Sequence, residues 1–218
     1  EQFLRIKNRI QTGTTPSQSD DNKDNFRSKI QESLIDSLND PYFDARAAAV
    51  IAMAKTSGYS QKIASMIDDK HVTVAEASIL ALGITKDPRA FSILKKIYED
   101  KDRYLRQRSF ALISLGFLPS TPEIEKILFD AVSKTSPDIS LKMCAAISIG
   151  LQKRNASTFI SLLKTKDELV LSHVIVSLAK LVKNDFENRL TLLKFLKNNF
   201  NSKSNNITRS CAIAYGEI

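Results

Sequence analysis

Cysteine and histidine are the residue types in this sequence best suited to nucleophilic or metal chemistry, and each occurs twice. Cys144 and Cys211 lie within apolar runs and outside any CxxC pattern, so we expect both to pack as small hydrophobic residues. Neither His71 nor His173 is followed by a second metal ligand three or four residues later. Metal sites usually need closely spaced ligands, and the sequence therefore predicts no metal site and no cofactor.

Paired carboxylates are the next candidates, because two acids at a suitable spacing can act as general acid and base. Asp68-Asp69 and Glu99-Asp100 are such pairs, but both fall near the ends of predicted helices, where turns and exposed positions are common. The sequence also lacks the P-loop, GxGxxG and GxSxG patterns. We therefore predict no catalytic residues and a protein that is not an enzyme.

The composition indicates a folded domain. The 218 residues are 43% hydrophobic and 26% charged, which is typical of a globular chain. The longest purely apolar stretch, Ala47 to Ala54, is much shorter than the roughly 20 residues that cross a bilayer. We expect no transmembrane segment. A cytoplasmic location is favoured, and the sequence does not decide whether a leader or anchor has been removed.

An internal repeat organises most of the chain. A small residue, a large apolar residue and then Gly or Ala recur six times. The six blocks are Ala52-Met53-Ala54, Ala81-Leu82-Gly83, Ser114-Leu115-Gly116, Ser148-Ile149-Gly150, Ser177-Leu178-Ala179 and Ala214-Tyr215-Gly216. Their last residues, called repeat ends below, are 29, 33, 34, 29 and 37 positions apart. A period in this range is typical of stacked helical repeats.

Each block ends a predicted inner helix. Residues three positions before the repeat ends are large and apolar, and those five before are mostly small. Such alternation lets neighbouring helices approach closely. A second amphipathic segment precedes each block, for example Phe91 to Tyr98, Ile124 to Val132 and Phe159 to Leu163. The sequence therefore predicts an all-α, right-handed α-solenoid of about six helical hairpins.

Helix boundary signals agree with this pairing. Thr121-Pro122-Glu123 and Ser136-Pro137-Asp138 each place a capping side chain, a proline and an acid in succession, as expected where a helix begins. Asp40-Pro41 and Asp87-Pro88 carry similar signals. Glycines at four repeat ends are predicted to close the inner helices as C-terminal glycines do.

The run from Asp40 to Ala54, Asp-Pro-Tyr-Phe-Asp-Ala-Arg-Ala-Ala-Ala-Val-Ile-Ala-Met-Ala, resembles HEAT repeats, particularly the short repeats named after phycobilisome lyases. That family typically carries an Asp between the helices and an Arg six residues later. Asp40 with Arg46 and Asp102 with Arg108 match this pattern, which implies that they are structural pairs. The resemblance implies a HEAT-like fold over residues 26–218 and no particular function.

Some enzymes are built on similar helical repeats. Deoxyhypusine hydroxylase holds iron with His-Glu pairs, and neither histidine here precedes a glutamate. HEAT-like alkylpurine DNA glycosylases use aromatic residues, with tryptophan prominent among them, and this chain has no tryptophan. A bilin-lyase-like enzyme stays open as an alternative, because that class lacks a sharp motif.

Both ends of the chain differ from the repeats. The stretch from Gln11 to Asn25 is rich in Thr, Ser, Asp, Asn and Gln without an apolar period, so we predict that residues 1–25 form a flexible segment or linker. At the other end, Ile213 and Tyr215 would face no following repeat. We expect the solenoid to continue beyond Ile218, or this edge to pack on another chain, including end-to-end self-association.

A candidate binding surface follows from the variable columns of the repeat. Positions ten and seven before the repeat ends vary and are partly polar, whereas the other inner-helix columns are regular. The residues selected on this basis are Asp44, Thr73, Glu76, Arg106, Ser109, Ser140, Met143, Ser172 and Arg209. Variation within a regular array is where a repeat protein can encode its partner.

We predict that this surface binds another protein, so that the chain acts as an interaction module or scaffold. The formal charge of +8 leaves a sequence-independent nucleic-acid binder as the alternative. From Leu151 onward, eleven Lys and Arg residues stand against five acids. Because most of these cations fall on or near outer helices, we expect nucleic-acid binding to be weak and easily removed by salt.

Overall fold

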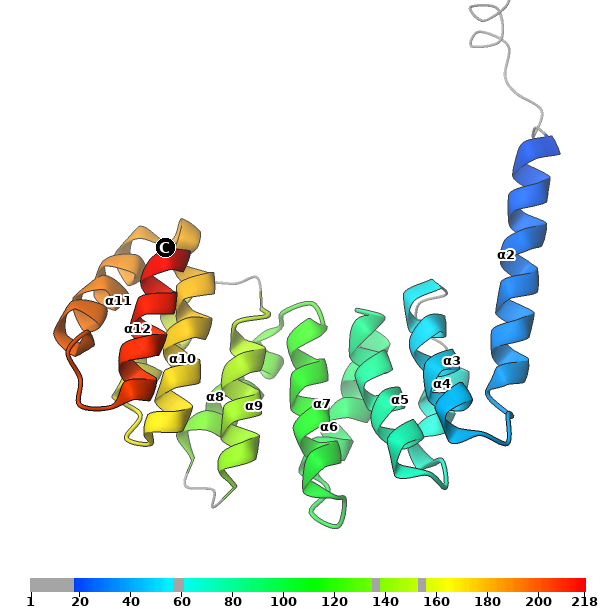
Figure 1. Cartoon of the computed structure of the whole chain (residues 1–218), viewed down its shortest axis with the longest axis horizontal. Coiled ribbons are helices and arrows are strands. Elements are labelled where there is room, and N and C mark those ends of the chain that lie inside the picture. The colour runs from blue at the N-terminus through cyan, green and yellow to red at the C-terminus, as the bar shows by residue number, and fades with distance from the viewer. Residues whose placement is uncertain (1–17, 57–60, 135–137, 153–155) are drawn as a thin grey trace, which may run out of the picture.

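The computed structural model describes residues 18–56, 61–134, 138–152 and 156–218, and every regular element within them is helical. One layer consists of the inner helices, which lie side by side along the long axis (Figure 1). These are α3 (Phe43–Thr56), α5 (Val72–Ile84), α7 (Leu105–Phe117), α9 (Ile139–Ile149), α10 (Glu168–Leu181) and α12 (Asn205–Glu217). Each packs on the next, so the predicted all-α solenoid is confirmed.

A second layer of outer elements lies behind the inner helices in Figure 1. Its members are α4 (Gln61–Ser65) with η1 (Met66–Asp68), η2 (Pro88–Ala90) with α6 (Phe91–Glu99), α8 (Pro122–Ser133), η3 (Ala156–Thr158) with η4 (Ile160–Lys164), and η5 (Val182–Asn184) with α11 (Phe186–Asn199). The core lies between the layers. For example, Leu94 of α6, Leu112 of α7 and Leu128 of α8 are fully buried.

Repeat length decides the form of each outer element. The two 29-residue repeats contain the five-residue helix α4 and the 3-10 turns η3 and η4. The longer repeats accommodate α6, α8 and α11. The outer helix predicted around Phe159 to Leu163 is therefore wrong as an α-helix, because the chain left over beside a full inner helix is too short. Phe159 and Leu162 still point into the core.

Capping side chains fix where several helices begin, as their sequences indicate. Thr121 accepts a hydrogen bond from the backbone N–H of Ile124, with Pro122 as the first residue of α8. Asp167 caps α10 in the same way through the N–H of Val170. The Ser136-Pro137 signal lies outside the described residues. These caps satisfy N–H groups that have no partner within the helix.

The first described helix, α2 (Gln18–Ser37), extends the structure at one end (Figure 1). It begins well before residue 26, so the predicted boundary between linker and solenoid falls inside a helix. Helix α2 packs on α3 through its C-terminal part, where Leu34 and Ile35 contact the core. This part carries the apolar spacing that predicts an outer helix before the first block, whereas the polar residues before residue 26 gave no such signal. Residues 1–17 lie outside the described part of the chain.

The glycines at the repeat ends allow successive inner helices to touch. A Cβ atom added at Gly83 would lie 2.6 Å from the Cα of Ser114, and one at Gly116 would lie 2.8 Å from the Cα of Ser148. Gly150, which caps α9, has a φ of −69°, so it does not need the left-handed conformation of a terminal glycine. The four glycines do lie at or next to the helix ends, as predicted, but Gly83, Gly116 and Gly150 serve close packing rather than a left-handed cap. We call these contacts between consecutive inner helices seams.

Hydrogen bonds across the seams reinforce this packing. The hydroxyl of Ser114 donates to the carbonyl oxygen of Ile79 at 2.8 Å, and that of Ser148 donates to the carbonyl oxygen of Leu112 at the same distance. In each bond, the serine lies two positions before its own repeat end. The carbonyl belongs to the residue four positions before the repeat end of the preceding repeat. The seam is thus built from a glycine, a facing serine and a backbone acceptor.

Candidate protein-interaction surface

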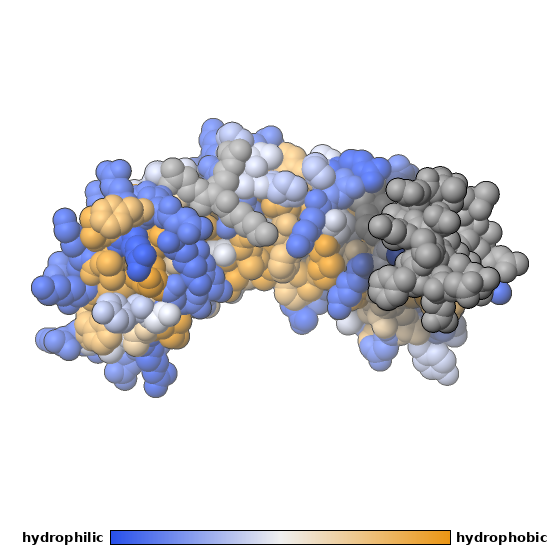
Figure 2. Space-filling model, turned by 90° about the horizontal axis from the view of Figure 1, so that it is seen from above, coloured by the Kyte–Doolittle hydropathy of each residue, from blue (hydrophilic) through white to orange (hydrophobic). Residues whose placement is uncertain are grey.

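The inner helices form one exposed face of the solenoid, called the inner face below. Seen from above, the molecule is curved, and hydrophobic residues gather on its hollowed side between the two ends (Figure 2). Because the inner helices stand in front of the outer ones in Figure 1, this hollowed side is theirs. The inner face is therefore concave and partly apolar.

The first predicted column, ten positions before the repeat ends, lies on this face. Asp44, Thr73, Arg106 and Ser140 are all exposed. Residues ten and three positions before a repeat end are seven apart, so they lie about 20° from each other around a helix. The same face must therefore include the column three before the repeat ends, which the sequence analysis assigned to packing.

The second predicted column, seven positions before the repeat ends, lies mostly in the seams. Glu76, Ser109 and Ser172 are buried, with 5%, 6% and 8% of their surface exposed, and Met143 is half-buried. Three residues along a helix rotate a side chain about 60° away from the first column, toward the neighbouring helix. These buried positions are not accessible to a partner, contrary to the expectation from the sequence. Arg209, at the open end, is exposed.

Apolar side chains fill the middle of the inner face. Leu80, Ile113, Ile147 and Val176, each three positions before a repeat end, lie on four consecutive inner helices, and we call them the apolar row. All four are incompletely buried, and Ile147 is 39% exposed. A surface with one such residue per repeat has the composition of an interface core.

Arg106 is the charged group of this region. Its guanidinium lies 3.1 Å from the carboxylate of Glu76 and 5.4 Å from the ring centroid of Phe110. The Arg106 side chain is 71% exposed, whereas that of Glu76 is 7% exposed. The buried carboxylate and the ring hold a cation at the surface, where it can still meet an acidic group.

The two residue types suited to chemistry also occur here, but their surroundings oppose reactivity. His173 Nδ1 lies 2.8 Å from the carbonyl oxygen of Leu169, which anchors the ring to its own helix. Burial raises the pKa of the Cys144 thiol, although a hydrogen bond with Ser109 opposes this, so the thiol stays protonated and weakly nucleophilic. No group of three metal-binding side chains occurs among the described residues.

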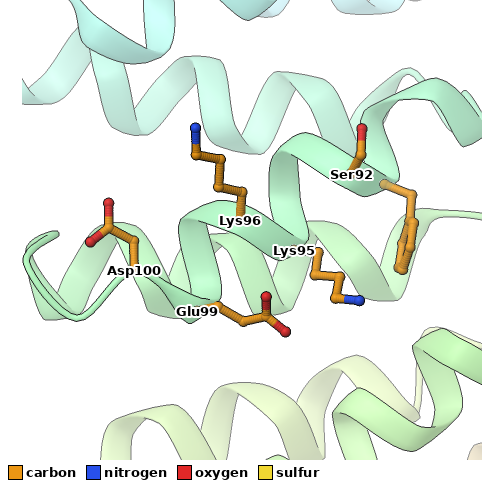
Figure 3. Close-up of a pocket in the computed structure, with 6 residues that line it drawn as sticks. Ser92, Lys95, Lys96, Glu99 and Asp100 are labelled. Carbon is orange, nitrogen blue, oxygen red and sulfur yellow. The ribbon is translucent and has the colours of Figure 1, made fainter.

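The acidic pair Glu99-Asp100 borders a depression of about 420 Å³ on the outer helix α6 (Figure 3). Lys95 and Glu99 lie on one side of the ribbon and Lys96 on the other, while Asp100 stands at the helix end (Figure 3). Lys95 instead reaches Glu123 of the next repeat at 2.7 Å. These groups diverge, so they do not form an acid and base pair around a common point.

The first predicted structural pair is rearranged in the structure. Arg46 donates to both carboxylate oxygens of Asp69, each at 2.9 Å, and to the backbone carbonyl oxygens of Asp40 and Pro41. It therefore joins the first repeat to the second rather than pairing with the Asp40 carboxylate. The carboxylate of Asp40 accepts a hydrogen bond from the N–H of Tyr42 at the start of α3. Asp69, fourteen positions before its repeat end like Asp40, was missed because its own repeat has Ala75 in place of the Arg.

The second predicted pair does not form. Arg108 donates from Nε to the carbonyl oxygen of Tyr98 at 3.0 Å, which ties α7 to the end of α6 within one repeat. Asp102 is exposed and its N–H bonds to the carboxylate of Asp100. The residues at the two repeated Arg positions thus act in different ways, one between repeats and one within a repeat.

Part of the chain matches a known family of helical repeats. Residues 31–113 match the family of HEAT repeats. No curated protein matches the chain. Human deoxyhypusine hydroxylase in complex with glycerol is similar with a TM-score of 0.46 and 16% identity, over 87% of this chain and 74% of that chain. The complex of CpcE and CpcF of phycocyanin lyase from Nostoc sp. PCC7120 is similar with a TM-score of 0.41 and 18% identity, over 86% of this chain and 99% of that chain.

The helices of the described residues include none that is long and apolar enough to cross a membrane. What identifies the chain is its repeat, with inner and outer layers and regular seams. The segment from residue 31 to residue 113 matches HEAT repeats, and the described chain folds as an α-solenoid of HEAT-like helical hairpins.

Proposed function

We propose that this chain is a non-catalytic interaction module that binds another protein along its inner face. HEAT repeats generally mediate protein interactions, which supports the general assignment. The observation that carries the proposal is the apolar row. Leu80, Ile113, Ile147 and Val176 stay partly exposed although the seams beside them are tightly packed. Solvent-exposed apolar residues in a regular array are typical of a binding surface.

The chemistry of this face favours a protein segment over a phosphate backbone. We consider the residues of α5, α7 and α9 that lie ten, seven, six and three positions before the repeat ends. Arg106 is the one charged residue among them that is exposed. Phosphate binding depends on several cations, whereas apolar contacts flanked by Thr73 and Ser140 suit a polypeptide. The partner would place apolar side chains about 10 Å apart, the usual distance between packed helices, and a carboxylate beside Arg106.

A comparison of capture by surface variants tests the proposal. The wild-type chain, Ile147→Glu, Arg106→Gln and Lys126→Glu would be immobilised and exposed to an extract of the source cells. Lys126 is an exposed residue of the outer helix α8 and serves as the control for a charge change away from the inner face. Arg106→Gln removes the cation beside the buried Glu76 and leaves a shorter amide donor there, so thermal unfolding of each variant would be measured to show that the fold is kept.

We expect at least one protein to be captured equally by the wild type and Lys126→Glu. Both inner-face variants should retain it at least tenfold less, as quantified by mass spectrometry. Equal capture by all four chains would contradict the proposal. Loss on Lys126→Glu alone would place the binding surface on the outer layer instead.

A further inference from the structure

Exposed apolar residues recur where the inner helices begin. The first residue of each of four consecutive inner helices is large, apolar and at least 36% exposed. These residues are Phe43, Val72, Leu105 and Ile139. The inner helices run in the same direction, so their N-terminal ends lie along one edge of the solenoid, the lower one in Figure 1. Because this edge runs along the stack, its exposure does not depend on what lies beyond either end.

Aromatic rings stand immediately before three of these helices. Tyr42, His71 and Tyr104 each lie twelve positions before a repeat end. Tyr42 and Tyr104 are 76% and 71% exposed, and both lie outside the hydrophobic core. The ring of His71 stacks on Phe43, with centroids 3.6 Å apart and an angle of 13° between the ring planes. We call this surface the aromatic edge, and its residues are Tyr42, Phe43, His71, Val72, Tyr104 and Leu105.

Contacts between loops hold the aromatic edge in place. Arg103, directly before Tyr104, donates to the carboxylate of Asp68 at 2.5 Å and to a backbone carbonyl oxygen of the same loop at 3.2 Å. The ion pair of Arg46 with Asp69 fixes the preceding loop to the first repeat in a similar way. Exposed rings on a rigid support lose little conformational entropy when a partner binds, which favours binding.

The same edge offers hydrogen-bond donors. Among the described residues, no side chain caps α5 or α7, whose N-cap residues are His71 and Tyr104. The first N–H groups of a helix have no partner within that helix. The hydroxyl groups of the two exposed tyrosines are further donors. A partner that suits the aromatic edge therefore combines apolar surface with carbonyl oxygens that need donors.

A polyproline II segment combines these two properties. It has no internal hydrogen bonds, so its carbonyl oxygens are free, and segments of this kind dock on aromatic surfaces. It completes one turn in three residues, or about 9 Å, which is close to the roughly 8 to 10 Å between packed helices. Successive turns of such a segment would therefore meet successive repeats of the aromatic edge.

Carboxylates beside the tyrosines indicate where the segment carries positive charge. Asp44 lies two positions after Tyr42, and Asp102 lies two positions before Tyr104. Both aspartates are exposed, and within the described residues neither carboxylate forms an ion pair. The two lie two repeats apart, roughly 20 Å, which corresponds to about six residues of a polyproline II segment. Basic residues at that spacing would meet both carboxylates.

The total charge around the edge argues against an anionic partner. Lys70 and Lys101 are exposed in the same loops and balance the charges of Asp44 and Asp102. Nucleic acids and anionic membranes are recognised through an excess of cations, which this edge lacks. An uncharged aromatic surface with local carboxylates suits a polypeptide better.

We propose that the aromatic edge binds a basic, proline-rich segment of a partner protein in the polyproline II conformation. Proline rings pack on Tyr42, on Tyr104 and on the aromatic stack between them. Basic residues six positions apart meet Asp44 and Asp102. Carbonyl oxygens of the segment accept hydrogen bonds from the tyrosine hydroxyls and from the first N–H groups of α5 and α7. This surface goes beyond the proposed inner-face function and does not depend on it.

A synthetic peptide of four Pro-Pro-Arg triplets is a direct probe. Its arginines fall on one side of a polyproline II helix and its prolines on the other sides, since the helix has three residues per turn. Labelled with a fluorophore, it would be titrated with the whole 218-residue chain at about 0.15 M salt and followed by anisotropy. Four Gly-Ser-Arg triplets give a peptide of equal charge without the preformed conformation, and four Pro-Pro-Glu triplets reverse the charge.

We expect saturable binding of the Pro-Pro-Arg peptide, and at least tenfold weaker binding of both control peptides. Tyr42→Ala and Tyr104→Ala should each raise the Kd at least fivefold. Phe186→Ala removes an equally exposed ring, 75% exposed at the start of the outer helix α11, and should leave the Kd unchanged. Asp44→Asn combined with Asp102→Asn should raise the Kd severalfold. Thermal unfolding of each variant would show that these surface changes keep the fold.

Several results would overturn the proposal. These are no saturable binding up to about 1 mM protein, equal binding of the Gly-Ser-Arg peptide, or binding that both tyrosine variants leave unchanged. Wild-type dimers that Tyr104→Ala abolishes in sedimentation would assign the edge to a second copy instead. Ile147→Glu should leave peptide binding unchanged, so failure of the inner-face function and failure of this proposal are distinguishable.

Discussion

The guanidinium of Arg46 and the carboxylate of Asp69 form two hydrogen bonds of 2.9 Å each, between residues that are 23 positions apart. Their side chains are 5% and 10% exposed. The carboxylate also accepts the backbone N–H of His71, whose ring stacks on Phe43 with centroids 3.6 Å apart. One ion pair thus connects the start of α3, the turn before α5 and an aromatic stack.

This geometry predicts how stability depends on pH. The hydrogen bond from Arg46 is the main cause that holds the pKa of Asp69 below its ordinary value. A carboxyl group with a lowered pKa in the folded state stabilises the fold above its unfolded pKa, near 4, and this contribution is lost as the pH falls through the folded value. The urea concentration at the midpoint of unfolding of the wild type should therefore fall as the pH is lowered below about 4.

Asp69→Asn should lower the urea midpoint at pH 7 and flatten this acid-dependent part of the curve. Asp102→Asn changes an exposed aspartate at the corresponding repeat position and should match the wild type. An Asp69→Asn chain that keeps the full acid dependence of the wild type would show that other carboxyl groups cause it.

The seam glycines predict opposite effects for the same substitution at two equivalent positions. Gly116→Ala forces a methyl group to within 2.8 Å of the Cα of Ser148, so it should destabilise the fold by about 1 to 3 kcal/mol. Gly216→Ala meets no atom within 4 Å and replaces glycine inside a helix, so it should be neutral or stabilising by about 0.5 kcal/mol. Thermal and chemical unfolding of the two variants would measure the difference. Equal losses would mean that Gly216, like Gly116, packs closely on another helix in solution.

The apolar row predicts a difference between two isoleucines of α9. Ile149 is 1% exposed and Ile147 is 39% exposed. Ile149→Ala should cost about 2 to 4 kcal/mol through the cavity that it leaves, whereas Ile147→Ala should cost under about 1 kcal/mol. Chemical unfolding of both variants checks this. A large loss for Ile147→Ala would make the apolar row part of the structural core.

The fold was predictable from the sequence because each repeat carries the same small and large residues at the same positions. The spacing of the repeat ends predicted six inner helices, and the structure has them. The C-terminal half of α2 was predictable from the apolar spacing of Ile30, Leu34 and Ile35, but its N-terminal part, up to Asn25, was not, since that stretch lacks an apolar period. The outer element of the fifth repeat was also missed, because a short apolar run does not distinguish 3-10 turns from an α-helix.

The candidate surface was predictable only in part. The exposed column that includes Thr73 and Arg106 followed from its variability, but Glu76 and Ser172 proved to be buried. The seven-residue spacing between columns was a signal that could have placed Ile147 on the same face. A regular apolar column is also typical of buried packing positions, so the sequence alone does not separate the two cases. The ion pair between Arg46 and Asp69 depends on how the first repeat stacks on the second. The spacing of residues within one repeat does not reveal that arrangement.

Arg108 gives a prediction about its backbone partner. Arg108→Met keeps the aliphatic stem but removes the hydrogen bond to the carbonyl oxygen of Tyr98, so it should destabilise the fold by about 1 kcal/mol. Asp102→Ala should change the free energy of unfolding by less than about 0.5 kcal/mol, because Arg108 does not pair with it. A double-mutant cycle between the two should show no coupling. A coupling above about 0.5 kcal/mol would restore the pair expected from the sequence.

Charge gives the last prediction, on nucleic acid. The exposed lysines of the C-terminal third are spread over different elements, including Lys164 in η4, Lys180 in α10, and Lys194 and Lys197 in α11. Cations dispersed in this way make few simultaneous phosphate contacts, and such binding falls steeply with salt. Titration of a single-stranded and a duplex oligonucleotide should therefore give weak binding at about 0.05 M salt and none at about 0.15 M. Lys194→Glu combined with Lys197→Glu should reduce the low-salt affinity, and Arg106→Gln should leave it nearly unchanged. Sub-micromolar binding that persists at about 0.15 M salt would contradict the inner-face proposal and make the chain a nucleic-acid binder.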